Sequence, residues 1–318
     1  MNTESLYLGV DVGGTNLKFG LINSNYELIY ENLLKLPVNT DGLFILEFIK
    51  QKIDEILNKF SGIQSIGIGL PGVINEKGEI VISPNIPQLN GLKIIEYFTQ
   101  KFNLPVAIDN DANVAAIAEM EAGVAKSLTN FVYITLGTGV GGAIIINRNI
   151  YRGSSGAAGE IGHIILNPFD EVDTNRPYRT GVLEEYLGKE AIIKIAVNLS
   201  RKFASSPIVV NNKYDVASIS HFADKGDHLS IETMKLAGYY LGIAIVSAAN
   251  LLDIPNFVIG GGISKSSKIF YNSALEVAKN RVLPHLSEKI KICNAQFTSK
   301  SGIIGAAIFG KFSQNNNQ

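Results

Sequence analysis

The segment YITLGTGVGGAIII, residues 133–146, places a glycine-rich turn between two runs of strand-forming residues. Gly137, Gly139 and Gly142 match the G-x-G-x-x-G spacing of dinucleotide-binding turns, but such a turn opens a helix. Here the turn is followed by Ala-Ile-Ile-Ile, a largely β-branched run that favours a strand. The segment therefore predicts a β-hairpin with a glycine tip.

A second segment with the same plan, YLGVDVGGTNLKFGLI, occupies residues 7–22. Glycines permit positive φ and close backbone approach, and successive backbone N–H groups form a nest that binds anions. Thr15 and Thr138 add hydroxyl donors to the two turns. We expect two such tips to face one another and to bind a polyphosphate from both sides. The alternative is a pair of ordinary tight turns.

Strand-like and helix-like segments alternate along the chain, which is typical of an α/β fold. The repeat of the two hairpins places a boundary near the helix that follows Asp111, so we expect one domain from residues 1–118 with 301–318 and a second from 119–300. We expect strands at 6–10, 17–22, 26–37, 63–70, 104–109 and 256–262, and helices at 41–59, 230–251, 265–283 and 301–312.

Composition excludes several classes of protein. The 318 residues carry a net charge of −1 without a basic cluster, which disfavours a nucleic-acid partner. The single cysteine, Cys293, excludes an intramolecular disulfide, and we expect it to be a buried thiol. There is no secretory signal pattern and no run of about 18 uninterrupted apolar residues, so we expect a cytoplasmic protein without a membrane partner.

Asp11 directly precedes the first glycine turn. A carboxylate beside a phosphate repels it unless a cation intervenes, and Mg²⁺, held through oxygen ligands and water, is the natural mediator. GGGISKS, residues 260–266, lacks the G-x-x-x-x-G-K-S/T spacing of a P-loop. The sequence therefore predicts a magnesium-dependent phosphate site of another kind.

AIDNDAN, residues 107–113, follows a predicted strand and opens a predicted helix with Asn110 or Asp111 as its N-cap. An ionised Asp111 at the positive end of the helix is suited to accept a proton from a substrate hydroxyl. The alternative is that Asp111 only caps the helix. Asn110 offers a donor and an acceptor to a polyhydroxyl ligand, whereas Asp109 is out of phase with Asp111.

Small residues surround Glu160 and His163 in YRGSSGAAGEIGHIIL, residues 151–166. The two side chains are suited to bind hydroxyl groups or a metal. The alternative is a solvated glutamate beside a structural histidine.

Seven motifs follow one another along the chain: LGVDVGGTNLKFGLI, GIGLPGVI, SPNIPQLNG, AIDNDANVAAIAE, TLGTGVGGAII, YRGSSGAAGEIGH and VIGGGIS. In this order they resemble the ROK family (repressor, open reading frame, kinase) over nearly the whole chain. YRGSSGAAGEIGH together with NDAN is highly specific, whereas DVGGT is shared with the wider actin-like and sugar kinase superfamily. The resemblance implies two actin-like (ribonuclease H-like) domains with ATP and sugar in a cleft between them.

The resemblance also implies a role for each matching residue. Asp111 is similar to the general base that takes the proton from the sugar hydroxyl. The positions matching sugar-hydroxyl partners are Asn85, Asn110, Glu160, His163 and Glu184. The two phosphate loops correspond to Asp11, Gly13, Gly14 and Thr15, and to Thr135, Gly137, Thr138 and Gly139, and the strand end that packs on adenosine to Gly260, Gly261 and Gly262.

One segment departs from the family pattern. The family follows its histidine with C-G-C-G-x-x-G-C-L-E, whose three cysteines bind zinc together with that histidine. Here the segment reads NRPYRTGVLEEY, which puts Asn175, Pro177 and Val182 at the cysteine positions. None of these supplies a thiolate, so we expect no zinc site and a histidine free to act on the sugar.

The resemblance implies an ATP-dependent kinase that transfers the γ-phosphate of MgATP to a hydroxyl, expected to be O6, of a hexose or N-acetylhexosamine such as glucose. It also implies a homodimer. One alternative is a catalytically weak or inactive sugar-binding ROK protein with a regulatory role. A DNA-binding repressor of the family carries a helix-turn-helix domain before the first phosphate loop, and we expect none here because that loop begins at Asp11. The hypothesis of a nicotinamide dehydrogenase is supported by the G-x-G-x-x-G spacing alone. The residue types do not specify the sugar.

Overall fold

The computed structural model describes residues 5–37 and 39–315. The chain forms two compact units. The described part of unit 1 lies within Met1–Ser127, Ile150–Ala158 and Ser299–Gln318, and unit 2 consists of Leu128–Asn149 and Gly159–Thr298. The expected domain boundaries near residues 118 and 300 stay a prediction.

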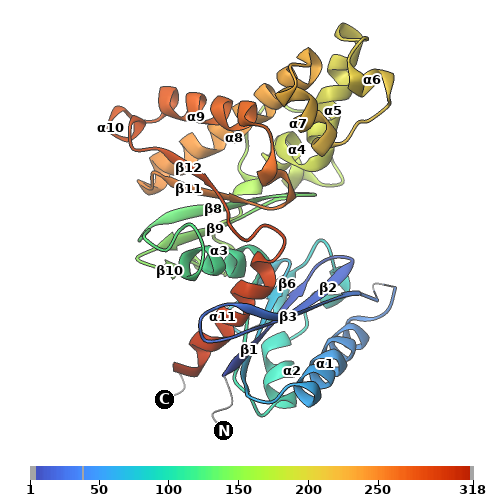
Figure 1. Ribbon diagram of the computed structural model, residues 1–318, viewed down its shortest axis with the longest axis vertical. Coiled ribbons are helices and arrows are strands. Elements are labelled where there is room, and N and C mark those ends of the chain that lie inside the picture. Colours follow the sequence, from blue (N-terminus) through green and yellow to red (C-terminus); the bar gives the residue numbers. More distant parts are fainter. Residues whose placement is uncertain (1–4, 38, 316–318) are drawn as a thin grey trace. The chain divides into compact units, whose positions relative to one another are not determined.

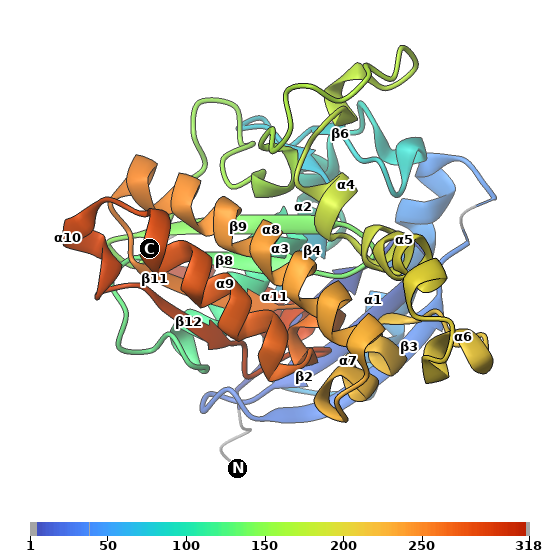
Figure 2. The same ribbon diagram turned by 90° about the horizontal axis from the view of Figure 1, so that it is seen from above.

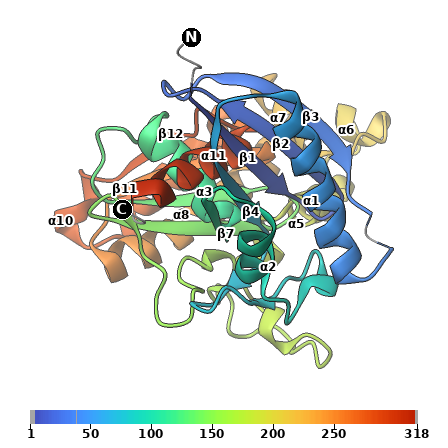
Figure 3. The ribbon, with the colours of Figure 1, turned by 90° about the horizontal axis from the view of Figure 1, so that it is seen from below.

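Unit 1 is built on a mixed five-stranded sheet of β1 (Leu6–Val12), β2 (Asn16–Ile22), β3 (Leu28–Lys35), β4 (Ile63–Leu70) and β7 (Val106–Asn110). The strand order is β3-β2-β1-β4-β7, of which Figure 1 labels β1, β2 and β3 and Figure 3 also labels β4 and β7. β1 and β2 form an antiparallel hairpin, and β4 runs parallel to both β1 and β7. The carboxyl ends of β1, β4 and β7 therefore share one edge of the sheet.

Helices cover both faces of this sheet. α1 (Gly42–Lys59) and α2 (Ile94–Lys101) bury apolar side chains on one face, where they share a core with Leu8 of β1 (Figure 3). α3 (Asp111–Glu121) and α11 (Ser301–Asn315) lie on the other face. Between β4 and α2 the chain forms a two-stranded ribbon, β5 (Val73–Ile74) and β6 (Ile80–Ile82), and a 3₁₀ turn at Pro87–Leu89.

Unit 2 repeats the sheet of unit 1. Its strands are β8 (Phe131–Leu136), β9 (Val140–Ile146), β10 (Asn149–Ile150), β11 (Asn256–Gly260) and β12 (Lys291–Asn294), in the order β10-β9-β8-β11-β12. β8 and β9 form an antiparallel hairpin, and β11 runs parallel to β8 and β12. Both predicted glycine-tipped hairpins, their internal repeat and the α/β fold are therefore confirmed.

Helices α8 (His228–Leu252) and α9 (Lys268–Arg281) lie side by side over the sheet of unit 2 (Figure 2). Alanines and glycines in the contact, such as Gly238 and Gly242, allow the two backbones to approach closely. The other helices of unit 2 are α4 (Glu184–Leu187), α5 (Lys189–Leu199), α6 (Pro207–Val210), α7 (Val216–Asp224) and α10 (Pro284–Ser287), with 3₁₀ turns at Ile161–His163, Pro177–Arg179, Ser200–Lys202 and Gly262–Lys265.

Among the described residues, α8 is the one helix long and apolar enough to cross a membrane by length and composition. Leu241, Ala244 and Ile245 of this helix are buried in the core of unit 2. Its contacts with α5, α7 and α9 are those of a core helix, which passes the same test of length and composition.

The expected helices and strands are present with ends shifted by a few residues, but the prediction for Cys293 is wrong. Cys293 is a free and exposed cysteine. It lies on β12, the edge strand of the sheet, where Ile292 is half-buried and Cys293 is not. A short edge strand leaves alternate side chains in solvent, so burial does not follow from residue type alone.

Glycine contacts hold α11 against the sheet and against α3. A Cβ atom added to Gly67 of β4 would lie 1.7 Å from the carbonyl oxygen of Ala306, and one added to Gly305 would lie 1.7 Å from that of Val114. The closing helix that the small residues of 301–312 predicted therefore packs as expected. Its first turn lies beside Asp11, since a Cβ on Gly302 would meet that carboxyl group at 2.5 Å.

We predict that Gly67→Ala lowers the free energy of unfolding by about 3 kcal/mol, because α11 must move away from the sheet. Gly91→Ala is the control, since a Cβ there meets no atom within 4 Å and its φ of +77° adds strain alone. We expect the control to cost about 1 kcal/mol. Urea unfolding followed by circular dichroism measures both, and equal losses would contradict the packing described.

Candidate functional site

The predicted site residues fall into one group in each unit. In unit 1 the strand register aligns Asp11 of β1 with Gly69 of β4, and Gly69 with Asp109 of β7. Asn110 ends β7, and Asp111 begins α3. The sheet therefore brings Asp11 and the segment 109–111 to one edge, where the carboxyl ends of α/β strands place ligands.

Asn110, rather than Asp111, is the N-cap of α3. Its Oδ1 atom accepts hydrogen bonds from the backbone N–H groups of Ala112 at 2.8 Å and Asn113 at 3.3 Å. Its Nδ2 atom donates to the carbonyl oxygen of Gly72 at 3.0 Å. Asp111 is half-buried in the first turn, where the helix dipole favours an ionised carboxylate. Asp111 is therefore not the N-cap residue, although its Oδ1 atom also accepts a hydrogen bond from the backbone N–H of Ala112 at 2.8 Å.

Asp109 has a structural environment. Its side chain is buried and forms an ion pair with Arg152, and its Oδ1 atom accepts a hydrogen bond from Nδ2 of Asn113 at 2.7 Å. The guanidinium of Arg152 also lies over the ring of Phe309, with 5.9 Å between its central carbon and the ring centroid. These contacts fix the segment 150–158 to the strand that carries Asn110.

The first hairpin tip contacts Asn85. A Cβ atom added to Gly14 would lie 3.3 Å from the Cβ atom of Asn85. The tip is closed by a hydrogen bond from the N–H of Gly13 to the carbonyl oxygen of Asn16 at 2.8 Å, and Thr15 is exposed on it. Unit 1 therefore places the predicted phosphate loop and one predicted sugar-binding residue next to each other.

Asp11 lies at the base of this tip with Lys18 as its partner. Nζ of Lys18 is 3.4 Å from Oδ2 of Asp11. Burial raises the pKa of the Asp11 carboxyl, and the charge and hydrogen bond of Lys18 oppose that rise. The described residues contain no group of three or more His, Cys, Asp or Glu side chains arranged to hold a metal ion. Asp11 is therefore not part of such a group within the described residues.

In unit 2 the second hairpin tip lines a cavity of about 630 Å³. Gly137 and Thr138 of the tip lie on its wall together with Gly262, which follows β11. The walls also carry two lysines and two aspartates, Lys189, Lys265, Asp215 and Asp224, so their formal charges balance. The cavity has the size of a small-ligand site.

The strand register explains why these glycines meet. Gly260 pairs with Thr135 of β8, and a Cβ atom added to Gly261 would lie 2.3 Å from the carbonyl oxygen of Leu136. Gly261 has a φ of +81°, a conformation that favours glycine. The turn after β11 therefore packs against the end of β8, directly beside the hairpin tip.

Glu160, His163 and Glu184 also lie in unit 2. Oε2 of Glu160 is 3.5 Å from Nδ1 of His163, and the ring of Tyr178 stacks on the imidazole at 6.4 Å between centroids. The hydrogen bond that Nδ1–H of His163 donates to the Glu160 carboxylate is the main cause that raises the pKa of His163. Burial and Arg179 oppose the rise, and the charges of Glu160 and Glu184 add to it.

The segment that replaces the cysteine motif is folded through polar contacts. Asp173 accepts hydrogen bonds from the N–H of Asn175 at 2.9 Å and from Nε of Arg176 at 3.1 Å. Pro177 begins a 3₁₀ turn, and Val182 is buried and bridges to Ile165. The three positions that lack cysteine thus serve a turn and a core contact.

Sequence reasoning missed Arg152, Tyr178, Arg179 and Lys189. A signal for Arg152 was present, because a carboxylate buried in a strand requires a cationic or hydrogen-bonding partner. Contacts of Tyr178, Arg179 and Lys189 depend on how a loop folds back, and their spacing in the sequence carries no such signal.

The chain belongs to the ROK family, whose family model matches residues 7–312. The glucokinase of Halalkalibacterium halodurans is 32% identical over 324 residues, which cover 98% of this chain and 97% of that enzyme. A crystal structure of a ROK family glucokinase from Streptomyces griseus in complex with glucose and AMPPNP has a TM-score of 0.79 at 25% identity, covering 97% of this chain and 100% of that one. The xylose repressor of Caldicellulosiruptor bescii is 26% identical over 306 residues, or 94% of this chain and 76% of the repressor. Relatives therefore include both sugar kinases and repressors.

We predict that Gly139→Ala destabilises unit 2. A Cβ atom at this position would lie 2.0 Å from Oε2 of Glu184. The carboxylate must then move and lose the hydrogen bond that Oε2 accepts from the backbone N–H of Val140. We expect a loss of about 1–3 kcal/mol in the free energy of unfolding. Gly137→Ala is the matched control on the same tip, because its Cβ meets no atom within 4 Å. Chemical unfolding measures both variants, and equal losses would contradict the placement of Glu184.

A second prediction concerns the ion pair of Glu160 with His163. Because Glu160 raises the pKa of His163, Glu160→Gln should lower it, as measured by NMR titration of the imidazole. The stabilisation from the pair is fully present below the ordinary histidine pKa and is lost as pH rises through the raised one. The side chains are partly exposed, so this stabilisation is below about 1 kcal/mol. The resonances of His221 and His285 are internal controls, and an unchanged His163 titration would refute the pairing.

Proposed function

We propose that this protein is an ATP-dependent sugar kinase that transfers the γ-phosphoryl group of MgATP to a hydroxyl, O6 by our inference, of a hexose or N-acetylhexosamine. The observation that carries the proposal is the cavity of unit 2. Gly137, Thr138 and Gly262 line one space of about 630 Å³, whose wall carries two lysines and two aspartates. The backbone N–H groups of a glycine-rich tip suit the phosphates of a nucleotide.

In this proposal the backbone N–H groups and hydroxyls of both hairpin tips bind phosphate oxygens. Gly137, Thr138 and Gly139 act in unit 2, with Thr135 at the end of the preceding strand and Gly260–Gly262 beside the adenosine. Gly13, Gly14 and Thr15 act in unit 1. Asp11 would hold Mg²⁺, which when bound neutralises charge on the phosphates.

Asp111 is the proposed general base. The sugar hydroxyl gives its proton to the Asp111 carboxylate while its oxygen bonds to the γ-phosphorus. The bond from that phosphorus to the bridging oxygen breaks, and ADP keeps the electron pair. Asn110 is the N-cap of α3, and Oδ1 of Asp111 accepts a hydrogen bond from the backbone N–H of Ala112 at 2.8 Å, which favours the ionised carboxylate. Positioning and electrostatic stabilisation supply most of the rate enhancement in phosphoryl transfer.

The proposed sugar-binding residues are Asn85, Asn110, Glu160, His163 and Glu184. The hydrogen bonds of Asn110 refine its part in this set. Its Oδ1 atom already accepts from two backbone N–H groups and one amide hydrogen is bonded to Gly72. We therefore assign its second amide hydrogen, a donor, to the sugar.

The second candidate is a catalytically weak or inactive sugar-binding protein with a regulatory role. It is supported by the 26% identity to a xylose repressor and by the replaced cysteine segment. An ADP-release assay with glucose, mannose, fructose, N-acetylglucosamine, N-acetylmannosamine and allose separates the two. Sugar-dependent ADP formation supports the kinase, and sugar binding in calorimetry without ADP formation supports the regulator.

We predict that Asp111→Asn lowers kcat by roughly 10²- to 10⁴-fold, because the hydroxyl then loses its proton acceptor. Sugar affinity measured by calorimetry should change by less than about threefold, since binding and proton transfer are separate contributions. Asp54→Asn is the control, a half-buried carboxylate on α1 paired with Lys50 at 2.9 Å. A folded Asp111→Asn variant with the turnover of the parent would remove Asp111 from this role.

A further inference from the structure

The carboxylate of Glu184 is held at both of its oxygen atoms. Oε2 accepts a hydrogen bond from the backbone N–H of Val140 at 2.8 Å. Oε1 lies 2.5 Å from Nη2 of Arg179. The side chain of Glu184 is 16% exposed, so it is largely but not wholly shielded from solvent. A glutamate with three rotatable bonds needs such partners to keep one orientation.

The Val140 contact joins Glu184 to the second hairpin tip. Val140 is the first residue of β9 and follows Gly139 directly. The absence of a Cβ on Gly139 leaves the space that Oε2 of Glu184 occupies. A proposed sugar-binding carboxylate is thus anchored on the loop that we assign to the nucleotide phosphates, within one unit.

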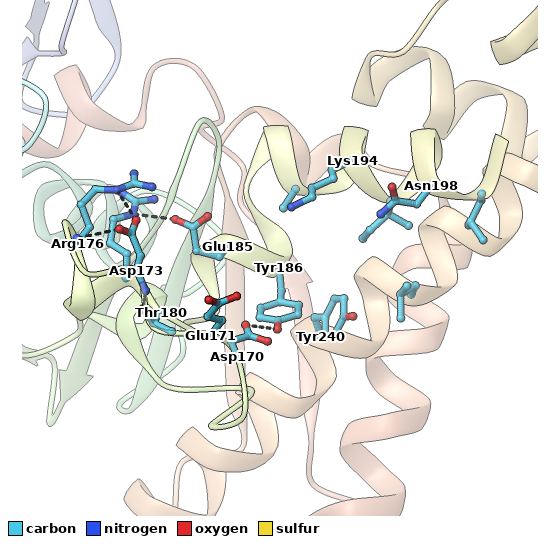
Figure 4. A pocket seen from close by; sticks show the side chains of 16 residues that line it. Asp170, Glu171, Asp173, Arg176, Thr180, Glu185, Tyr186, Lys194, Asn198 and Tyr240 are labelled. Carbon is cyan, nitrogen blue, oxygen red and sulfur yellow. Dashed lines mark hydrogen bonds and ion pairs between the residues drawn. The ribbon is translucent and has the colours of Figure 1, made fainter. Parts of the chain in front are cut away.

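Arg179 binds two consecutive glutamates with one guanidinium. Besides its contact with Glu184, its Nε atom donates to Oε1 of Glu185 at 2.8 Å. Glu185 lies on the wall of a cavity of about 550 Å³, and Tyr186 and Asp170, joined by a hydrogen bond, line the same cavity (Figure 4). The planar fork of arginine spans two carboxylates at once, whereas the ammonium of lysine is a single point charge.

The backbone around Arg179 is itself fixed. Its N–H donates to the carbonyl oxygen of Arg176 at 2.9 Å, and the N–H of Thr180 donates to that of Pro177 at 3.2 Å. The same turn presents Tyr178 to the ring of His163. One short turn therefore supports two of the proposed sugar-binding residues, His163 through stacking and Glu184 through charge.

From these contacts we propose that Arg179 is a positioning residue. It orients the Glu184 carboxylate so that the carboxylate accepts a hydrogen bond from a hydroxyl of the sugar. The inference rests on the proposed function for the identity of the ligand. The orientation of Glu184 does not depend on that function and can be measured without substrate.

The kinetic test compares Arg179→Met, Arg179→Lys and Arg176→Met. Arg176 is the matched control, because it lies on the same turn and pairs with Asp173 rather than with Glu184. Arg179 lines a cavity, so its truncation leaves open space and no overpacked core. We expect Arg179→Met to raise the KM for sugar by roughly 10- to 100-fold, which is the contribution of one hydrogen bond to a charged group. The KM for MgATP should change by less than about threefold, because that ligand does not contact Glu184 in the proposal.

Arg179→Lys should restore part of the sugar affinity through its charge, and Arg176→Met should match the parent. An Arg179→Met variant whose sugar KM is that of the parent would overturn the proposal. Equal increases in Arg179→Met and Arg176→Met would also overturn it, because they would show a general effect on the turn.

The structural test needs no sugar. The amide resonance of Val140 reports its hydrogen bond to Glu184, and Glu184→Gln defines the change when that carboxylate is lost. We expect the Val140 amide resonance to shift in Arg179→Met and to stay unchanged in Arg176→Met. If the Val140 resonance shifts in Arg179→Met but the protein forms no ADP in the presence of sugar, the positioning of Glu184 by Arg179 is supported and the proposed kinase function is contradicted. An unshifted resonance in Arg179→Met would overturn the positioning itself.

Discussion

In each unit a glycine-tipped hairpin and the carboxyl end of a neighbouring parallel strand meet at one edge of the sheet. β1, β4 and β7 bring Asp11 and the segment 109–111 to that edge in unit 1, and β8 and β11 bring Gly137 and Gly262 together in unit 2. Because parallel strands end at the same edge, residues far apart in the sequence become neighbours there. The glycines allow the backbone to turn and to approach a ligand or a side chain closely.

A second theme is that structural polar residues hold the proposed functional ones. Asn110 caps α3 and leaves Asp111 in the first turn, and Arg152 pairs with the buried Asp109, which precedes Asn110 in β7. In unit 2, Val140 and Arg179 together fix the carboxylate of Glu184. A carboxylate that acts on a substrate must keep one orientation and its charge, and fixed partners provide both. The ROK segment that carries cysteines in the family pattern is folded in this chain by hydrogen bonds, an ion pair and a buried valine.

The sequence predicted the parts of this structure that depend on local pattern. The two hairpins follow from glycine between β-branched runs, and α11 from a row of small and apolar residues. It left open whether Asn110 or Asp111 caps α3, because both types are good caps and only the folded turn decides. Cys293 was predicted to be buried because of its residue type, but residue type does not show that the strand that carries it lies at the edge of the sheet. Arg179 was not predicted because its contacts with Glu184 and Glu185 depend on the path of a loop, and the residue spacing does not encode that path.

The proposed kinase function depends most on nucleotide binding in the cavity of unit 2. Its most direct test is a titration of the protein with AMPPNP and Mg²⁺, followed by amide resonances in ¹H–¹⁵N spectra. The account predicts that the resonances of Gly137, Thr138 and Gly262 shift together as the nucleotide binds. Saturation that leaves these three unchanged, while resonances around Asp170 and Tyr240 shift, would place the nucleotide in the other cavity and contradict the account.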